Sequence, residues 1–341
     1  MNITPINMMK IARSRFITHR PICLSHRLSF KCNLKCKMCT AWRVKHKNEL
    51  KLNEIFGMLD DARENDILFY IVTGGEPLLN KNFPKILKYA KETGLYTIFN
   101  TNGMLLKEKI NKIADYASSI TVSLDGLEIV HNRIRNCEKT FQRAIDGIKK
   151  AKELGVTIKI NSTITRETVH EMESIAKLAK ELGVLITLQP IIPYDASFRS
   201  LTLGKKDFET YVRNVFILKK MGYPITNSYK PLKFIHSNYS IYRKGRGCHY
   251  PEICIRVYPT GKVSSCKPLP INIKNTSFKE IFNSKIYKKL LINAQNCRKC
   301  HYKSFPWTME SNTLYDFDFT KMISNILNNL SFNREINFAS L

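Results

Sequence analysis

The chain has 341 residues, of which 43% are hydrophobic, so it is long enough to bury one large core and a smaller one. Fifty-five basic residues against 28 acidic ones give a formal net charge of +27, which suits an acidic peptide, anionic lipid or nucleic acid as partner. No apolar run reaches the length of a membrane span, arginines interrupt any signal-peptide core, and the ten cysteines are too unevenly spaced for a secreted disulfide framework. These features exclude the exported and membrane-spanning classes and predict a cytoplasmic protein.

The first 20 residues, MNITPINMMKIARSRFITHR, form a basic segment with interspersed apolar side chains. Basic and apolar residues on opposite sides of a helix are typical of a segment that lies on an anionic membrane surface. We therefore expect that this segment allows peripheral membrane contact.

Alternating strands and helices follow. Strands are predicted at 22–28, 67–73, 95–100, 119–124, 156–162 and 184–192, and helices at 50–64, 83–93, 105–115, 138–154, 168–182 and 207–221. Three helices end alike, with a lysine-rich last turn, then Gly94, Gly155 or Gly183, then an apolar run. Glycine accepts the left-handed conformation that stops a helix, and the apolar run indicates a buried parallel strand. Six such units are fewer than the eight of a closed TIM barrel, so residues 21–222 predict an α/β fold with a partial (β/α)6 TIM-like barrel.

The helix expected at 168–182 shows its start and its buried face in the sequence. Thr168 and Glu171 have the spacing of a capping box. Apolar residues then recur along one face of the helix, at Met172, Ile175, Ala179 and Leu182. We predict that Thr168 and Glu171 cap this helix and that the apolar face packs on the sheet.

The barrel pattern ends near residue 222. A polar, aromatic connection is predicted over 223–247, followed by a small module over 248–307. In this module ICIRVYPTGKVSSC predicts a β-hairpin that turns at Pro259, Thr260 and Gly261, and a helix is expected near 277–293. Apolar residues at helical spacing in YDFDFTKMISNILNNLSF predict an amphipathic C-terminal helix within 308–341.

Three cysteines lie close together directly after the first predicted strand. In KCNLKCKMC, Cys32, Cys36 and Cys39 have the spacing Cys-x3-Cys-x2-Cys. Zinc fingers and ribbons usually pair two knuckles so that four ligands close the site, whereas three thiolates on one loop fit three corners of a 4Fe-4S cluster. The sequence therefore predicts an iron site that lacks a fourth protein ligand.

This spacing, on the loop after the first strand of a βα barrel, resembles the signature of the radical S-adenosylmethionine (SAM) superfamily. The resemblance implies that the amino and carboxylate groups of SAM chelate the fourth iron. It extends to Gly74, Gly75, Glu76 and Pro77 after the second strand, which look like the family's motif for the SAM amino group. By the same resemblance, four further residues are expected to contact SAM: Ser123, Asp125, Arg135 and Asn161.

A second group of cysteines follows the barrel. Cys248 and Cys266 flank the hairpin, and Cys297 and Cys300 form a knuckle, so four thiolates could enclose a second 4Fe-4S cluster. The arrangement resembles the Twitch module, a shortened SPASM domain that follows many radical SAM barrels. Cys254 is a further candidate ligand, and a zinc ribbon on the same four cysteines stays open.

Two other cysteines and one tyrosine are expected to have structural roles. We expect Cys23, on the first strand, and Cys137 to be small buried side chains. We expect Tyr258, in the hairpin, to be a packing residue. No residue is assigned as catalytic.

The resemblance implies an enzyme that reductively cleaves SAM at its cluster to a 5′-deoxyadenosyl radical, which abstracts hydrogen from a substrate. A reductant such as ferredoxin or flavodoxin and a peptide or lipid substrate are the expected partners. The alternative is a non-catalytic Fe-S or zinc protein that binds RNA or anionic surfaces through its positive charge. Nucleic acid is disfavoured, because aromatic residues do not alternate with a basic stripe.

Overall fold

The computed structural model describes residues 5–45, 48–191, 195–227, 241–242, 248–297 and 299–300. The strands of the main sheet are β1 (Cys23–Ser29), β2 (Phe69–Gly74), β3 (Tyr96–Thr101), β4 (Ser119–Ser123), β5 (Ile158–Ile164), β6 (Leu185–Pro190), β8 (Cys254–Val257), β9 (Lys262–Ser264) and β10 (Pro268–Asn272). Two short strands, β7 (Ile241–Tyr242) and β11 (Lys299–Cys300), pair separately.

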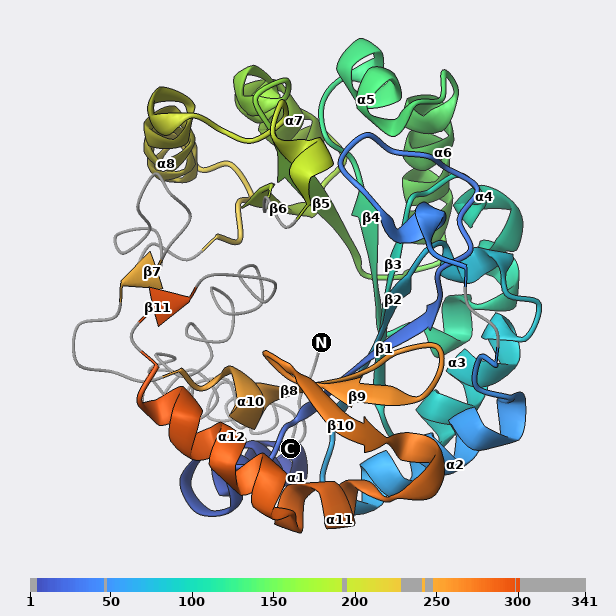
Figure 1. Ribbon diagram of the computed structural model, residues 1–341. Coiled ribbons are helices and arrows are strands. Elements are labelled where there is room, and N and C mark those ends of the chain that lie inside the picture. Colours follow the sequence, from blue (N-terminus) through green and yellow to red (C-terminus); the bar gives the residue numbers. More distant parts are fainter. Residues whose placement is uncertain are drawn as a thin grey trace, which may run out of the picture.

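The helices follow the strands in sequence and cover one side of the sheet. The longer ones are α2 (Leu52–Glu64), α3 (Phe83–Glu92), α5 (Glu128–Arg135), α6 (Thr140–Glu153), α7 (Met172–Glu181), α8 (Lys205–Lys220) and α12 (Lys285–Gln295). Figure 1 shows them as an outer layer around a curved sheet, and in the described part of the chain the edge strands of this sheet, β10 and β6, do not pair with each other. The predicted fold class, a partial TIM-like barrel followed by a small hairpin and helix module, is confirmed.

The main sheet has nine strands in the order β10-β9-β8-β1-β2-β3-β4-β5-β6. Strands β1 to β6 pair in parallel with their sequence neighbours. Because side chains alternate between the faces of a strand, one face turns toward the helices and forms the main apolar core. Examples from that core are Leu24, Val72, Val122, Ile160 and Leu188.

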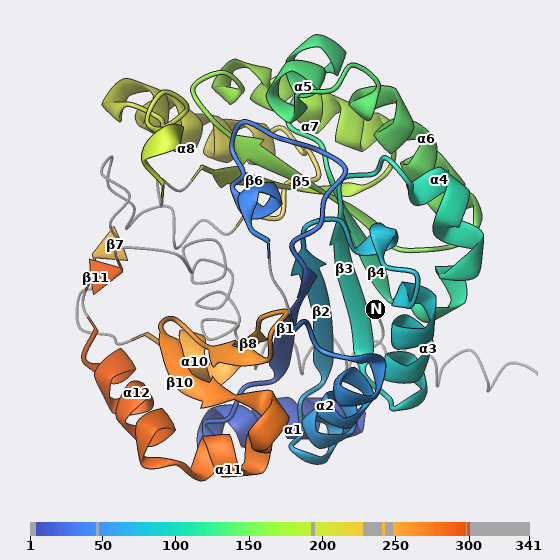
Figure 2. The same cartoon turned by 45° about the vertical axis from the view of Figure 1, so that its right-hand side comes forward.

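The hairpin after the connection continues the barrel sheet. Strand β8 pairs in parallel with β1, with Cys23 opposite Cys254, and in antiparallel with β9. The views in Figures 1 and 2 both show this hairpin, in orange, beside the blue first strand. The hairpin predicted around Pro259 is therefore confirmed, and long-range pairing attaches it to the edge of the barrel.

Two predicted helices are divided in the structure. The helix expected at 105–115 is a turn, α4 (Leu106–Lys109), followed by two 3-10 turns, Ile110–Lys112 and Ala114–Tyr116. The tighter turns bring both Ile110 and Ile113 into the core. The helix expected near 277–293 is α11 (Phe278–Asn283) and α12, because extended Ser284 separates them and its hydroxyl accepts a hydrogen bond from the Tyr287 N–H, 3.1 Å away.

The capping box predicted at Thr168 and Glu171 is wrong. The Thr168 hydroxyl accepts from the Thr165 N–H and donates to the Thr163 carbonyl, at 2.7 and 3.0 Å. A Glu171 carboxylate oxygen instead accepts from the Leu127 N–H at 2.9 Å. Thr168 is thus used at the end of β5 and Glu171 in a contact with the loop after β4, and α7 begins only after a 3-10 turn.

The basic N-terminal segment forms α1 (Pro5–Arg13) and a π-helical turn, Ser14–Thr18. Within the described residues, none of the helices has the length and apolar character that crossing a bilayer requires. The predicted amphipathic tail helix lies outside the described residues.

Candidate functional site

The first cysteine group lies on the loop that leaves the carboxyl end of β1. Each of its three sulfur atoms accepts a hydrogen bond from a nitrogen donor. The Leu34 N–H lies 3.5 Å from Cys32 Sγ, the Ala41 N–H lies 3.4 Å from Cys39 Sγ, and Arg135 Nη1 lies 3.9 Å from Cys36 Sγ. Such donors stabilise negative charge on sulfur, which suits thiolates that ligate iron.

Asn102 is a residue of this site that the sequence did not single out. Its side-chain amide donates to Cys32 Sγ at 3.8 Å and to Asn33 Oδ1 at 2.8 Å. It follows β3 in the NTNG segment, so its position after a strand was the available signal. Asn102 therefore links the end of β3 to the cysteine loop.

The protonation of the thiols also reflects their surroundings. Burial raises the pKa of the Cys36 thiol to about 11, although the positive charge of Arg135 opposes the shift. Burial also raises the pKa of Cys32. Cluster binding must release these protons, so it is expected to strengthen as the pH rises.

Gly74 and Gly75 permit the cysteine loop to pack against the end of β2. A Cβ on Gly74 would lie 2.2 Å from the Ser29 carbonyl oxygen, and one on Gly75 would lie 2.1 Å from the Lys31 carbonyl oxygen. The Gly75 N–H donates to the Ser29 carbonyl at 2.7 Å. Both glycines are therefore needed where β2 closely approaches the backbone of the loop that carries the cysteines.

We expect Gly75→Ala to destabilise the fold by about 1–3 kcal/mol, because the new methyl group forces the Lys31 carbonyl to move. The iron content should fall with it, since the displaced backbone precedes Cys32 directly. Thermal unfolding and an iron assay measure both effects. Gly57→Ala is the matched control: nothing lies within 4 Å of its Cβ, and it lies inside α2, so it should stabilise the protein by about 0.5–1 kcal/mol. Equal effects of the two substitutions would contradict this account.

Glu76 is 2% exposed and is held by three hydrogen bonds. Its carboxylate accepts from the Leu78 N–H, the Thr101 hydroxyl and the Asn102 N–H, at 3.1, 2.9 and 2.8 Å. Burial raises the pKa of this carboxyl to about 7, although these hydrogen bonds and the charge of Arg135 oppose the shift. Glu76 therefore joins the ends of β2 and β3 beneath the cysteine loop.

The raised pKa of Glu76 predicts a pH dependence of stability. The folded state binds this proton more tightly than the unfolded state, where the pKa is near its ordinary value of 4.5. The contribution to stability is therefore complete below about pH 4.5 and is lost as the pH rises to about 7. Urea unfolding at about pH 5 and about pH 8 should show a larger fall for the parent than for Glu76→Gln, by on the order of 2 kcal/mol. Equal falls in the two proteins would refute this assignment.

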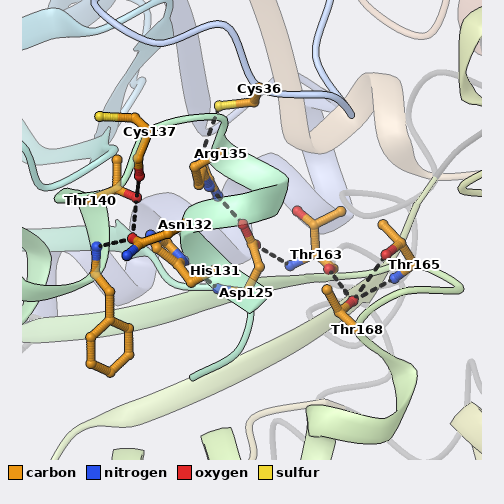
Figure 3. A network of polar contacts seen from close by, with 11 residues as sticks. Cys36, Asp125, His131, Asn132, Arg135, Cys137, Thr140, Thr163, Thr165 and Thr168 are labelled. Atoms are coloured by element: carbon orange, nitrogen blue, oxygen red, sulfur yellow. Dashed lines mark hydrogen bonds and ion pairs between the residues drawn. The ribbon is translucent and has the colours of Figure 1, made fainter. Parts of the chain in front are cut away.

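Arg135 and Asp125 form a buried ion pair beside Cys36, as Figure 3 shows. Arg135 Nε lies 2.6 Å from Asp125 Oδ2, and the Thr163 N–H donates to Asp125 Oδ1 at 2.8 Å. His131 Nδ1 accepts from the Asp125 N–H at 3.1 Å, and burial lowers the pKa of His131 to about 4, so this ring is neutral at pH 7. The pair fixes the guanidinium that donates to the Cys36 sulfur.

The other expected SAM contacts lie at the same edge of the sheet. Ser123, at the carboxyl end of β4, is the register partner of Asn161 in the middle of β5, and both side chains are half-buried. Pro77 is buried at the start of the 3-10 turn after Glu76. The structure brings all of these residues to the carboxyl edge, and their contacts with SAM stay predictions.

The second cysteine group gathers under the hairpin. Cys248 and Cys254 belong to one buried cluster with Cys23, and Cys266 and Cys297 pack against it. The sequence did not foresee that Cys23 joins this group, because the parallel pairing of β1 with β8 brings it there. Cys300 lies in β11, and its side chain is outside the described part.

Across the ranges that the structure describes, no three His, Cys, Asp or Glu side chains converge on a position for a single metal ion. Both sets of cluster ligands, Cys254 included, therefore remain predictions. Two observations support them. Nitrogen donors surround the sulfur atoms of the first cysteine group, and the cysteines of the second group lie in or against one buried cluster.

Comparisons with known proteins match two regions of the chain. Residues 27–179 match the radical SAM superfamily, and residues 248–301 match an iron–sulfur cluster-binding domain called SPASM. An AdoMet-dependent heme synthase of Methanosarcina barkeri is 25% identical over an alignment of 315 residues, which covers 84% of this chain and 90% of that protein. An Fe-coproporphyrin III synthase of the same organism is 30% identical over 155 residues, 44% of this chain and 39% of that protein, so this match spans less than two thirds of the relative.

Solved structures show the same fold. The crystal structure of Streptococcus suis SuiB bound to its precursor peptide SuiA superposes with a TM-score of 0.65 at 16% identity, over 84% of this chain and 70% of that one. At this level of identity the likeness establishes the arrangement of barrel and C-terminal region.

Proposed function

The chain belongs to the radical SAM superfamily and carries a SPASM-type iron–sulfur domain after its barrel, and from this premise we propose that Cys32, Cys36 and Cys39 hold a 4Fe-4S cluster that binds S-adenosylmethionine. When bound, this group supplies an electron that cleaves SAM reductively to a 5′-deoxyadenosyl radical, and the radical abstracts hydrogen from the substrate. The observation that carries the proposal is that all three sulfurs accept hydrogen bonds from nitrogen donors at the carboxyl edge of the sheet.

The residues around the cysteines orient the site and adjust its charge. Arg135 and Asn102 donate to the sulfurs of Cys36 and Cys32, which lowers the cost of negative charge there. The buried pair of Arg135 with Asp125 keeps that donor in place. We propose that Ser123, Asn161 and Arg135 also bind polar groups of SAM, together with the segment Gly74, Gly75, Glu76 and Pro77.

A second cluster is proposed in the SPASM region. Cys248, Cys266, Cys297 and Cys300 are its ligands, with Cys254 as the competing candidate for one position. Support comes from the match over residues 248–301 and from the buried cysteine cluster under the hairpin. Iron and acid-labile sulfide counts distinguish one cluster from two and an iron–sulfur site from zinc.

For the substrate we propose a peptide. The fold it shares with SuiB, which was crystallised with a precursor peptide, supports this class. A tetrapyrrole is the second candidate, because an AdoMet-dependent heme synthase matches 84% of this chain and 90% of its own length. The lipid class has less support, because neither the heme synthase nor the SuiB match names a lipid.

Two further partners are proposed. An acidic electron carrier such as ferredoxin or flavodoxin suits the net charge of +27. Contact with an anionic membrane surface is supported by α1 and the following turn, where Ile6, Met9 and Ile17 are exposed beside Lys10 and Arg13. Retention on anionic vesicles, compared with neutral vesicles, tests this contact.

Anaerobic reconstitution with iron and sulfide, followed by incubation with SAM and dithionite, tests the central reaction. Release of 5′-deoxyadenosine and methionine in equal amounts is the expected result. A preparation that holds its full iron yet releases neither product would instead favour the non-catalytic binding protein.

A further inference from the structure

The inner face of the barrel carries polar and positively charged side chains next to an apolar cluster that includes Ile71 and Cys254. On β1 to β6 and β8, the residues that alternate with the core-facing positions point away from the helices. These inner positions include Arg27, Lys159 and Arg256, and none of the inner positions on these seven described strands is Asp or Glu. The carboxylates Glu76 and Asp125 lie in the loops after the strands.

Strands β1 and β8 pair where the barrel meets the hairpin, and this junction is called the seam. Two of the three cations, Arg27 and Arg256, lie on opposite sides of it. Arg256 is on β8, in register with Ser25 of β1, and Arg27 is two residues further along β1. Arg27 Cζ lies 5.3 Å from the centre of the Tyr258 ring and 5.7 Å from that of Phe30. These aromatic faces hold the guanidinium plane in a fixed position.

Arg256 lies deeper than Arg27. It is 7% exposed, and its Nη2 donates to the Tyr250 hydroxyl at 3.2 Å. Arg27 and Tyr258 are half-buried, so they are the members of the seam that a substrate in the barrel can reach. Burial alone would raise the pKa of the Tyr258 phenol, but the positive charges of Arg27 and Arg256 hold it below its ordinary value.

We propose that Arg27 and the Tyr258 hydroxyl bind a carboxylate of the substrate, and that buried Arg256 adds positive charge behind them. The inference rests on the proposed function, since both substrate classes proposed above carry carboxylates. A guanidinium fork matches a carboxylate with two parallel hydrogen bonds, and a phenol adds a third donor.

The position of this seam suits an anchor for the reaction. Arg27 lies on the strand that ends in the first cysteine loop, five residues before Cys32. Tyr258 follows the strand that begins at Cys254, in the second cysteine group. A carboxylate held here therefore lies at the junction of the barrel and the SPASM region, and the rest of the substrate can extend toward the carboxyl edge of the sheet, where SAM is proposed to bind.

Equilibrium binding to the reconstituted full chain, with two pairs of probes, tests the anchor. One pair is a fluorescent glutamate-rich peptide and its glutamine counterpart, and the other is coproporphyrin III and its tetramethyl ester. We expect the parent to bind the carboxylate member of one pair and to bind the neutral member at least about tenfold more weakly. The pair that shows this difference identifies the source of the carboxylate.

Arg27→Gln should weaken binding of that probe at least about tenfold, and Arg27→Lys should restore part of it, because the charge returns without the planar fork. Arg143→Gln is the matched control, since Arg143 lies on α6 in the outer layer and pairs with exposed Glu108. Iron content and circular dichroism establish that each variant is folded.

Three results would overturn the proposal. The parent and Arg27→Gln could bind the probe equally well, the parent could bind both members of each pair equally well, or the parent could bind none of the probes. Inorganic phosphate, added at millimolar concentration, is the competitor. If phosphate displaces the carboxylate probe and binds the protein as tightly as the probe or more tightly, the choice of carboxylate is overturned. Release of 5′-deoxyadenosine by the parent is measured separately, so a failed anchor with active SAM cleavage leaves the proposed function standing.

Discussion

Replacing Cys36 with alanine is expected to lower 5′-deoxyadenosine release by more than about a thousandfold, to the level of SAM in dithionite alone. Cys36 is buried, and its sulfur accepts from Arg135, so no exposed thiol or water can take its place as a ligand. Cys32→Ala and Cys39→Ala should have effects of the same size, because each sulfur occupies its own corner of the cluster. Chromatographic quantification of 5′-deoxyadenosine under anaerobic conditions measures the loss.

Cys137→Ala is the matched control for the three cysteine variants. Cys137 is half-buried next to the end of α5, and its backbone forms hydrogen bonds with Asn132 and Thr140. This variant should keep its activity, while each of the three loop variants should lose about four iron atoms per chain. Undiminished SAM cleavage by all three loop variants would remove the basis of the proposed function.

Arg135→Leu is expected to destabilise the protein by about 3–5 kcal/mol, because it leaves the fully buried carboxylate of Asp125 without its counter-charge. The same change removes the donor to the Cys36 sulfur, so the iron content should fall as well. Denaturant unfolding of the parent and the variant measures the loss of stability.

A surface pair and a double variant control for this effect. Lys150 and Glu153 lie 3.0 Å apart on the exposed side of α6, and Lys150→Ala should cost less than about 1 kcal/mol. In the double variant Arg135→Leu with Asp125→Asn, the buried charge is absent, so part of the lost stability should return. A double variant no more stable than Arg135→Leu would show that the loss comes from packing.

The sequence alone determined the features that depend on neighbours along the chain. Repeated helix ends at Gly94, Gly155 and Gly183 predicted repeated units of a helix followed by a parallel strand. A glycine in the left-handed conformation stops a helix locally, and all three have positive φ. The turn around Pro259 predicted the hairpin, because a tight turn also depends on residues that are neighbours in the chain. The spacing of three cysteines on one loop predicted the radical SAM family, because ligand spacing on a short loop is a local property.

Only the tertiary structure decided what depends on contacts between distant segments. The carboxylate of Glu171 is engaged by the distant Leu127 N–H, so the capping box that the sequence predicted is not formed. The clash partners of Gly74 and Gly75 are carbonyls about 45 residues earlier in the chain, which gives these glycines a packing role. The pairing of β1 with β8 brings Cys23 to the second cysteine group and Arg27 near Tyr258. Such pairings join residues more than 200 positions apart, and no periodicity within either segment encodes which strand edge the other will meet.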